Sequence, residues 1–387
     1  MPLAADQIST DPIRVMMVDD SAIIRGLYRR LLAQDSEVEV VNDASNGQQA
    51  VERLAKQQVD VIVLDIEMPI MDGLTAIPKL LEVQPSVTIV MASTLTAANA
   101  DISLRAMEAG AADYIQKPTT NTELSTGQDF RSELLQKVKT LGEVGRRKAA
   151  MIAARKSALS PASPSAPAAA VKTDTSAPWS MPQQGDVSLR KAGMVKPKLL
   201  AVGSSTGGPQ ALRRFFELLS PDIGIPVVVT QHMPPTFTAI LAEHIGKGTS
   251  WECREGAHGD LLKPGLALIA PGGYHMTIDD VGGTPTVHLN QDPPESFCRP
   301  AVDPMLRSVS KTYGAAVLTV ILTGMGNDGM KGGQVIVDGG GTLFAQDEES
   351  SVVWGMPGAV AGAGICSTIA PLEELPKHIK QFVSRTV

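Results

Sequence analysis

The sequence contains few cysteines: three among 387 residues, at Cys253, Cys298 and Cys366. Their number is odd and their spacing is wide, which fits neither a disulfide framework nor a zinc site. We therefore expect buried free thiols, the ordinary state of isolated cysteines in a globular protein.

The sequence also lacks an excess of positive charge and a long apolar segment. Its net charge is −7, which argues against a general nucleic-acid binder. No apolar run approaches the roughly 18 residues that a membrane-spanning helix needs. The N-terminal segment MPLAADQIST has no basic stretch followed by an apolar one, as a signal peptide would. These absences predict a cytoplasmic protein without membrane insertion.

What the sequence does contain is enough for two domains. With 387 residues, 43% of them hydrophobic, each half can bury its own core. Prolines recur among Ala and Ser over residues 157–182, where no helical or strand period survives, so this stretch is predicted to be a flexible linker. We divide the chain into an N-terminal domain (12–135), a helical extension with the Ala/Pro/Ser-rich linker (136–195) and a C-terminal domain (196–387).

On each side of the linker, apolar β-branched runs alternate with amphipathic helical stretches. Near-continuous Val/Ile/Leu runs are typical of strands that are covered on both faces. The alternation predicts an α/β fold: two doubly wound parallel-sheet domains, in which ligands bind outside the carboxyl ends of the strands. The predicted strands are RVMMVD, VEVV, VDVIVLD, VTIVMAS and ADYIQK before the linker, and KLLAVG, IPVVVTQ, LALIAP and AAVLTVILTG after it.

Polar residues end several strands of the N-terminal half. Asp19 and Asp20 follow the first strand, and Asp65 ends the third. Three converging carboxylates repel one another unless a cation joins them, and oxygen ligands of this kind suit Mg²⁺. Ser93 ends the fourth strand and Lys117 follows the fifth, so a hydroxyl and an ammonium at the same edge can contact a phosphoryl group.

This half resembles the receiver domain of bacterial two-component response regulators over residues 12–135. The matching motifs are VDDSAIIR, DIEMPIMDG, MAS and YIQKP. The resemblance implies that Asp65 accepts a phosphoryl group from a histidine kinase, with Mg²⁺ neutralising the developing charge. By position it implies Asp19, Asp20, Asp65 and the Glu67 carbonyl as metal ligands, Ser93 and Lys117 as phosphoryl contacts, and Tyr114 as the aromatic switch residue.

After the linker, residues 203–207 fit the pattern G-x-S-x-G between a strand and a helix. This turn presents Ser205 at the edge of the sheet, and the N-terminus of the following helix provides free N–H groups for an oxyanion. A glycine-rich turn before a helix also binds nucleotide phosphates, although this one lacks the P-loop lysine. The motif by itself leaves both functions open.

Two further residues can complete a serine hydrolase site. His232 ends the strand IPVVVTQH, and Asp328 lies in the turn after AAVLTVILTG. With Ser205 they provide a nucleophile, a general base and an orienting carboxylate at one edge. Their order along the chain, Ser–His–Asp, differs from the Ser–Asp–His order of the α/β-hydrolase fold. His275, after the turn APGG, is a second histidine able to reach this edge.

Residues 196–387 closely resemble the catalytic domain of the protein-glutamate methylesterases of bacterial chemotaxis. The matching segments are GSSTGG, TQHMPPTFT, IAPGGYHM, RPAVDPML and LTGMGNDGM. The resemblance implies Ser205 as nucleophile, His232 as base, Asp328 as its partner, and Thr206 with the Met325 N–H as oxyanion support. Members of that family hydrolyse glutamyl γ-methyl esters on chemoreceptor helices, some also deamidate receptor glutamines, and the hydrolysis needs no cofactor.

The prediction is phosphorylation-activated hydrolysis of glutamate γ-methyl esters on chemoreceptors, which resets receptor sensitivity during chemotactic adaptation. Three alternatives stay open: a same-family esterase serving a non-chemotaxis receptor, a response regulator whose second half only binds, and a nucleotide-binding output domain that uses GSSTGG. The acidic balance disfavours a transcription-factor output.

Overall fold

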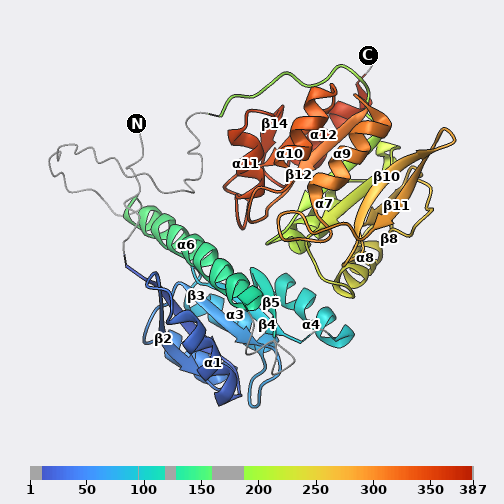
Figure 1. The fold of residues 1–387 in the computed structure, drawn as a ribbon. Coiled ribbons are helices and arrows are strands. Elements are labelled where there is room, and N and C mark those ends of the chain that lie inside the picture. The colour runs from blue at the N-terminus through green and yellow to red at the C-terminus, as the bar shows by residue number, and fades with distance from the viewer. Residues whose placement is uncertain (1–10, 95, 118–127, 159–186, 386–387) are drawn as a thin grey trace. The chain divides into compact units, whose positions relative to one another are not determined.

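The computed structural model describes residues 11–94, 96–117, 128–158 and 187–385. Within them the chain forms two compact α/β units, each with its own parallel sheet (Figure 1). The predicted fold class is therefore confirmed. The predicted linker, 157–182, falls almost wholly on residues 159–186, outside the described residues. Every helix among the described residues is too short or too polar to span a bilayer.

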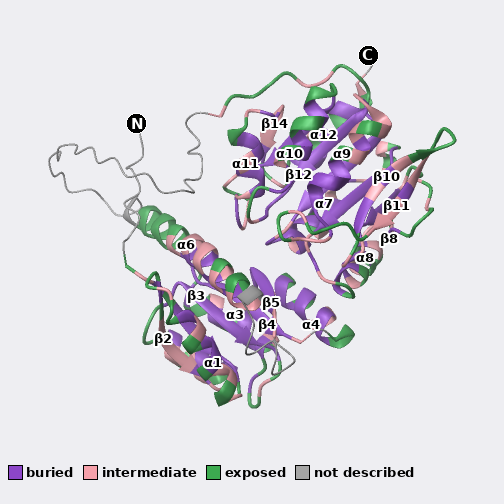
Figure 2. Ribbon diagram, viewed as in Figure 1, coloured by how far each residue is buried: buried purple, intermediate pink, exposed green. Residues whose placement is uncertain are grey.

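The N-terminal unit is built on a five-stranded parallel sheet with the order β2-β1-β3-β4-β5. Its strands are β1 (Ile13–Val18), β2 (Val38–Ala44), β3 (Val61–Asp65), β4 (Thr88–Ser93) and β5 (Asp113–Gln116). Its helices are α1 (Ala22–Leu32), α2 (Gly47–Leu54), α3 (Gly73–Val83), α4 (Ala97–Glu108) and α6 (Gln128–Ala158). Strands β3 and β4 are buried throughout (Figure 2). The chain order reverses between β1 and β3, and the carboxyl ends of such strands form a binding crevice.

Three helices of this unit begin at capping residues that the sequence provides. The side chains of Ser21, Asn46 and Asp72 each accept a hydrogen bond from the backbone N–H three residues later, at the starts of α1, α2 and α3. Because Ser21 caps α1, the carboxylate of Asp20 is not used for capping and stays exposed at the edge of the sheet.

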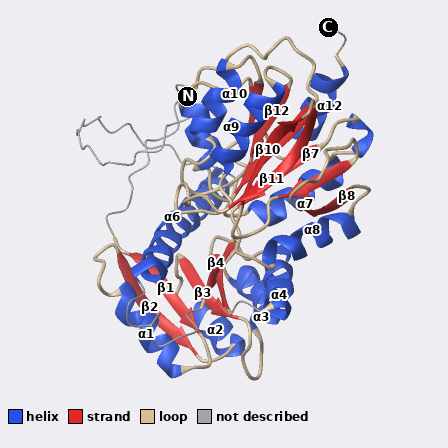
Figure 3. Ribbon diagram, turned by 45° about the vertical axis from the view of Figure 1, so that its right-hand side comes forward, coloured by secondary structure: helices blue, strands red, loops and turns tan. Residues whose placement is uncertain are grey.

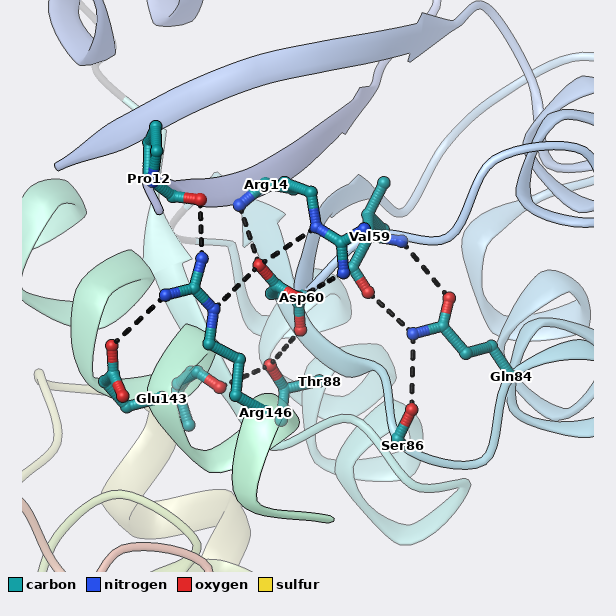
Figure 4. Close-up of polar contacts among 10 residues, drawn as sticks. Pro12, Arg14, Val59, Asp60, Gln84, Ser86, Thr88, Glu143 and Arg146 are labelled. Atoms are coloured by element: carbon teal, nitrogen blue, oxygen red, sulfur yellow. Dashed lines mark hydrogen bonds and ion pairs between the residues drawn. The ribbon is translucent and has the colours of Figure 1, made fainter. Parts of the chain in front are cut away.

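The long helix α6 is fixed to the amino ends of the strands by close packing and by ion pairs (Figure 4). A Cβ atom on Gly145 would lie 2.5 Å from the Asp60 carbonyl oxygen, so only glycine allows this approach. The Asp60 carboxylate pairs with Arg146 of α6 at 3.1 Å and with Arg14 of β1 at 2.8 Å. Residues 147–156 of this helix are exposed. The predicted boundary between residues 135 and 136 falls inside this helix.

The C-terminal unit is built on a seven-stranded parallel sheet with the order β14-β13-β12-β6-β7-β9-β8. Its strands are β6 (Leu199–Ser204), β7 (Val227–Gln231), β8 (Glu252–Glu255), β9 (Leu266–Ile269), β12 (Val317–Ile321), β13 (Thr342–Gln346) and β14 (Thr368–Ala370). A separate antiparallel hairpin consists of β10 (His275–Val281) and β11 (Thr284–Asn290), as Figure 3 shows. The sequence predicts β6, β7, β9 and β12; it misses β8, β13, β14 and the hairpin.

Helices pack on both sides of this sheet. They are α7 (Gly208–Leu218), α8 (Phe237–Gly248), α9 (Val302–Tyr313), α10 (Met330–Asp338), α11 (Met356–Gly362) and α12 (Leu375–Ser384), with a short 3-10 helix at Pro221–Ile223. Helix α9 lies against β6, β7 and β12 and also contacts the hairpin strand β10. It therefore connects the centre of the sheet to the hairpin.

Candidate active site and acidic pocket

The carboxyl ends of β1 and β3 bring three carboxylates together. One oxygen from each of Asp19, Asp20 and Asp65 lies within 4.8 Å of the others. Asp19 and Asp65 are buried and Asp20 is exposed. The strand-end argument predicts this convergence, because β1 and β3 are direct neighbours in the sheet.

Lys117 forms ion pairs with two of these carboxylates. Its Nζ lies 2.7 Å from Asp19 Oδ2 and 2.7 Å from Asp65 Oδ1. Burial raises the pKa of Asp65, Lys117 acts against this rise, and the Asp19 charge adds to it. The three carboxylates outnumber this one ammonium, so the pocket carries excess negative charge. Such a set of oxygen ligands fits a hard divalent cation.

The other residues predicted for this pocket lie around it. Ser93 is buried at the end of β4, and its carbonyl accepts the Lys117 N–H. The Glu67 side chain is exposed in the loop that follows β3. After that loop, the first residue of α3 packs tightly against the strand end, because a Cβ on Gly73 would lie 2.1 Å from the Asp65 carbonyl oxygen.

Tyr114 has a partner that the sequence reasoning missed. Its side chain is only 8% exposed, and Lys137 of α6 lies 5.0 Å from the ring centroid. The Lys137 ammonium also donates to the Tyr114 carbonyl at 2.5 Å and forms ion pairs with Asp113 at 3.3 Å and Glu133 at 3.0 Å. The signal for Lys137 is weak in the sequence, since it reads as an ordinary charge on an amphipathic helix.

In the C-terminal unit, Ser205 lies in a tight turn between β6 and α7. Its N–H donates to the Thr323 carbonyl at 3.0 Å. Gly207 has a φ of +75°, a conformation that favours glycine. A Cβ on Gly208 would lie 1.9 Å from Gln231 Oε1, so the second glycine is needed for space. The glycines of GSSTGG therefore serve this turn and its contact with β7.

Gln231 connects this turn to the neighbouring strand and was not among the predicted site residues. Its side-chain amide donates to the Ser205 carbonyl at 2.9 Å and to the His232 carbonyl at 3.2 Å. Its Oε1 accepts the Ser204 hydroxyl at 2.7 Å. Ser204 and Gln231 are register partners on β6 and β7, so Ser205 and His232 follow at the same edge of the sheet.

His232 and Asp328 are joined directly. His232 Nε2 lies 2.7 Å from Asp328 Oδ2, and both side chains are largely buried. Because a carboxylate only accepts hydrogen bonds, Nε2 carries the proton in the neutral ring and Nδ1 then holds the lone pair. Within the described residues, no hydrogen bond joins His232 Nδ1 to Ser205 Oγ. Such contacts are often long in the absence of substrate.

The Asp328 carboxylate is held by backbone donors from the start of α9. Its Oδ2 accepts the Val302 N–H at 2.6 Å, and its Oδ1 accepts the N–H groups of Asp303 at 3.0 Å and Gly329 at 2.9 Å. Burial would raise the pKa of Asp328, but His232 and the N–H groups of Val302 and Asp303 lower it below its usual range. Asp328 is therefore ionised at neutral pH.

The electrostatics of His232 follow from these contacts. Burial would lower its pKa, but the contacts with Cys298 and Asp328 outweigh burial and raise the pKa above its usual value. Because Asp328 is ionised, its charge and its hydrogen bond favour the protonated form of the ring. A raised pKa makes Nδ1 a stronger base.

Asp303 and Asp328 cap each other's helices. Asp328 precedes α10 yet accepts N–H groups at the start of α9, whose own N-cap residue, Ala301, has no capping side chain. Asp303, in the first turn of α9, accepts the N–H groups of Gly329 at 3.0 Å and Gly332 at 2.7 Å at the start of α10. The sequence motif RPAVDPML contains Asp303, but nothing in its spacing points to Asp328.

His275 is occupied elsewhere. Its Nδ1 accepts the Ala301 N–H at 3.2 Å, and its Nε2 lies 3.2 Å from the Pro293 carbonyl oxygen. Both ring nitrogens are therefore engaged by backbone groups, and the residue is 1% exposed. His275 holds the segment before α9 in place, which makes it a poor candidate for the base.

The remaining predicted residues lie beside this turn. Thr206 is buried, and Met325 is half-buried in the loop after β12. The three cysteines are free, as expected, but only Cys366 is buried; Cys253 and Cys298 are partly exposed, so the expectation of burial was wrong for two of them. Cys253 lies on β8, the edge strand of its sheet, and Cys298 lies in a turn, and solvent reaches such positions.

Comparisons with known proteins agree with this arrangement. The response regulator receiver domain family matches residues 15–127, and the CheB methylesterase family matches residues 200–379. A protein-glutamate methylesterase/protein-glutamine glutaminase 1 of Paramagnetospirillum magneticum is 49% identical, with 100% of both chains covered. This chain belongs to the CheB methylesterase family. It is a hydrolase with an N-terminal receiver domain and a C-terminal methylesterase domain.

Two further similarities are found. A protein-glutamate methylesterase/protein-glutamine glutaminase of Azospirillum brasilense is 51% identical over 97% of this chain and 94% of its own. The crystal structure of the Thermotoga maritima CheB methylesterase catalytic domain is 36% identical, with a TM-score of 0.47, and covers 48% of this chain and 99% of that one.

Proposed function

We propose that this CheB-family chain hydrolyses glutamyl γ-methyl esters, and deamidates glutamines, on chemoreceptor helices in the cytoplasm. The observation that carries the proposal is the His232–Asp328 hydrogen bond of 2.7 Å, which lies at the strand edge that also carries Ser205. The names of the full-length relatives support the choice of glutamyl esters and glutamines as substrates.

The first half of the reaction forms an acyl-enzyme. His232 Nδ1 takes the proton of Ser205, and Oγ attacks the ester carbonyl carbon while the carbonyl electron pair moves to oxygen. The N–H groups of Thr206 and Met325 hold this oxyanion. Among the described residues no acceptor takes the Met325 N–H, which supports this role. When the intermediate collapses, His232 returns the proton to the departing methoxide and methanol leaves.

The second half releases the product. Water gives a proton to His232 Nδ1 and attacks the acyl carbon, and the Ser205 oxygen leaves with that proton. A glutamate side chain is the product. With a glutamine substrate the leaving group is ammonia, and the second half is the same. These steps use only protein groups and water, so we propose that hydrolysis needs no cofactor.

We propose that phosphorylation of Asp65 controls this reaction, with a histidine kinase as phosphodonor. Asp19, Asp20, Asp65 and the Glu67 carbonyl would hold Mg²⁺, which neutralises charge on the transferring phosphoryl group. Lys117, already in contact with Asp65, would pair with a phosphoryl oxygen. Ser93 and Tyr114 would then respond to the phosphoryl group. Because the Lys137 ammonium lies over the Tyr114 ring, a rotation of this ring would change its contact with Lys137.

The test is the release of methanol from methylated receptor membranes, with and without a phosphodonor. We expect release by the wild-type chain, acceleration by acetyl phosphate with Mg²⁺, and no release by Ser205→Ala. Hydrolysis of small esters without release from chemoreceptors would favour a same-family esterase serving another receptor. Tight nucleotide binding without ester hydrolysis would favour the phosphate-turn alternative, which the relatives do not support.

A further inference from the structure

A two-residue turn near His232 has an unusual backbone. The N–H of Cys298 donates to the Glu295 carbonyl at 2.9 Å, and the N–H of Glu295 donates to the Cys298 carbonyl at 3.2 Å. The two central residues, Ser296 and Phe297, have φ values of +51° and +62°. A hairpin turn with two positive φ values has type I′ geometry, for which Asn-Gly is the preferred pair. A bulky residue in this region is strained.

The strained residue presents its side chain to solvent. Phe297 is fully exposed, at 102%, whereas the other six of the seven phenylalanines are buried or half-buried. The turn therefore combines two unfavourable features, a left-handed backbone and an aromatic ring in water. Strain of this kind persists where surrounding contacts enforce it, and it clusters at functional sites.

The contacts that hold this turn are specific. Glu295 forms two hydrogen bonds with Arg307 of α9, one of them at 3.0 Å. Arg299 Nη1 donates to the carbonyls of Gln291 at 2.9 Å and Asp292 at 3.1 Å. The exposure of Phe297 is therefore not the result of an unattached loop: both flanks of the turn are fixed.

The same segment leads directly into the candidate active site. Cys298, next to Phe297, is close enough to His232 to affect its charge. Val302, five residues after Phe297, donates its N–H to Asp328. The turn and the Asp328 carboxylate are thus both attached to α9, through Arg307 and Val302 respectively.

We propose that Phe297 is a specificity residue that binds the apolar face of the receptor helix carrying the glutamyl ester. This rests on the proposed function. A helix is an extended partner that contacts the enzyme beyond the reacting side chain, and an exposed aromatic ring is a typical anchor for such a surface. The ring takes no part in the proposed acyl transfer, so we expect it to bind the ground state and the transition state alike and to act on KM rather than on kcat.

The test compares two substrates across matched variants. The substrates are methylated receptor in membranes and the small ester N-acetylglutamate γ-methyl ester. For Phe297→Gly we expect the ratio of kcat/KM for receptor to kcat/KM for the small ester to fall about 10- to 100-fold, the range for losing a buried aromatic side chain. For Phe297→Leu we expect a smaller fall in this ratio. Val281→Ser, at the exposed tip of the hairpin, is the control and should leave the ratio unchanged.

A second measurement separates binding from folding. Glycine adopts a φ of +62° without strain, so Phe297→Gly should have an unchanged or higher Tm while its substrate ratio falls. An unchanged ratio in both Phe297 variants overturns the proposal. The proposal is also overturned if the wild-type chain self-associates and Phe297→Gly abolishes the self-association without changing the substrate ratio. That result would assign the ring to contact with a second copy of the chain. If the wild-type chain releases no methanol from receptors at all, the proposed function fails instead.

Discussion

Replacing Asp328 with asparagine removes one charge and keeps the shape, but it leaves too few acceptors for the donors around this side chain. Each carboxylate oxygen of Asp328 accepts two donors: Oδ2 takes the N–H of Val302 and Nε2 of His232, and Oδ1 takes the N–H groups of Asp303 and Gly329. An asparagine amide has one oxygen and one NH₂ group. Whichever way it turns, the NH₂ group faces two donors.

The two orientations differ in their effect on His232. With the NH₂ group toward the other pair, the Asp303 N–H loses its acceptor, but the Gly329 N–H keeps Asp303 Oδ1 at 3.0 Å. With the NH₂ group toward His232, the ring can move its proton to Nδ1 and accept through Nε2, so only the Val302 N–H loses its acceptor. Either orientation leaves one additional buried donor unsatisfied, at a cost of about 1–3 kcal/mol, but only the one with the NH₂ group toward His232 changes the tautomer of the ring.

That orientation places a proton on His232 Nδ1, the nitrogen that must accept the Ser205 proton. We expect Asp328→Asn to lower kcat about 10³- to 10⁴-fold, as the corresponding change does in serine proteases, with partial recovery at high pH. The backbone N–H that loses its acceptor, Val302 or Asp303, should also lower stability by about 1–3 kcal/mol, which is several degrees of Tm.

The assay is methanol release as a function of pH, together with thermal unfolding. Asp338→Asn is the matched control, because Asp338 is an exposed residue at the end of α10 that accepts only a side-chain hydrogen bond from Gln334. It should retain the wild-type rate and Tm. Wild-type rates for Asp328→Asn across the pH range would refute the reasoning and leave Asp328 as a capping residue only.

The other predictions concern the nucleophile, the receiver and its ion pairs. Ser205→Ala should abolish methanol release but leave receiver phosphorylation intact; if it keeps more than about a tenth of the activity, against the loss expected for a nucleophile, Ser204 is tested next. We expect the unphosphorylated receiver to inhibit the catalytic domain, so residues 196–387 alone should demethylate faster than the unphosphorylated full chain. Acetyl phosphate with Mg²⁺ should accelerate the full chain but not Asp65→Asn. Equal rates for the isolated domain and the unphosphorylated chain would contradict inhibition by the receiver. Burial would raise the pKa of Asp60, but its arginine partners hold that pKa below its usual range. The ionised carboxylate therefore stabilises the fold above the unfolded pKa of about 3.9, and this stabilisation is lost as the pH falls through the folded pKa. Asp60→Asn should therefore lower receiver stability at pH 7 and matter less at pH ~3, measured by urea unfolding; the same difference at both pH values would contradict this.

Much of the acidic pocket could be predicted because it depends on strand ends. A parallel strand is recognisable as an apolar run, and the residue that follows it lies at the carboxyl edge whatever the strand order. This rule located Asp19, Asp65 and Lys117, which the structure brings within 2.7 Å contacts. It also placed Ser205 and His232 at the edge of one sheet.

The contacts between side chains and distant backbone groups were beyond the reach of the sequence. Gln231 reads as the last residue of a strand, yet its amide hydrogen-bonds the carbonyls of Ser205 and His232. From the sequence, His275 is a possible base, but in the structure both of its ring nitrogens contact backbone groups. Strands β8 (ECRE), β13 (TLFAQ) and β14 (TIA) were missed because none of them contains a continuous Val/Ile/Leu run like those of β7, β9 and β12.

The sequence by itself therefore determined the two parallel sheets and the residues at their edges, because apolar runs and glycine turns are local properties of the chain. Tertiary structure alone decided that Asp303 and Asp328 cap each other's helices and that Phe297 stands exposed on a strained turn. Those features depend on where α9 packs, which brings together residues about 25 positions apart through hydrogen bonds that no local pattern encodes.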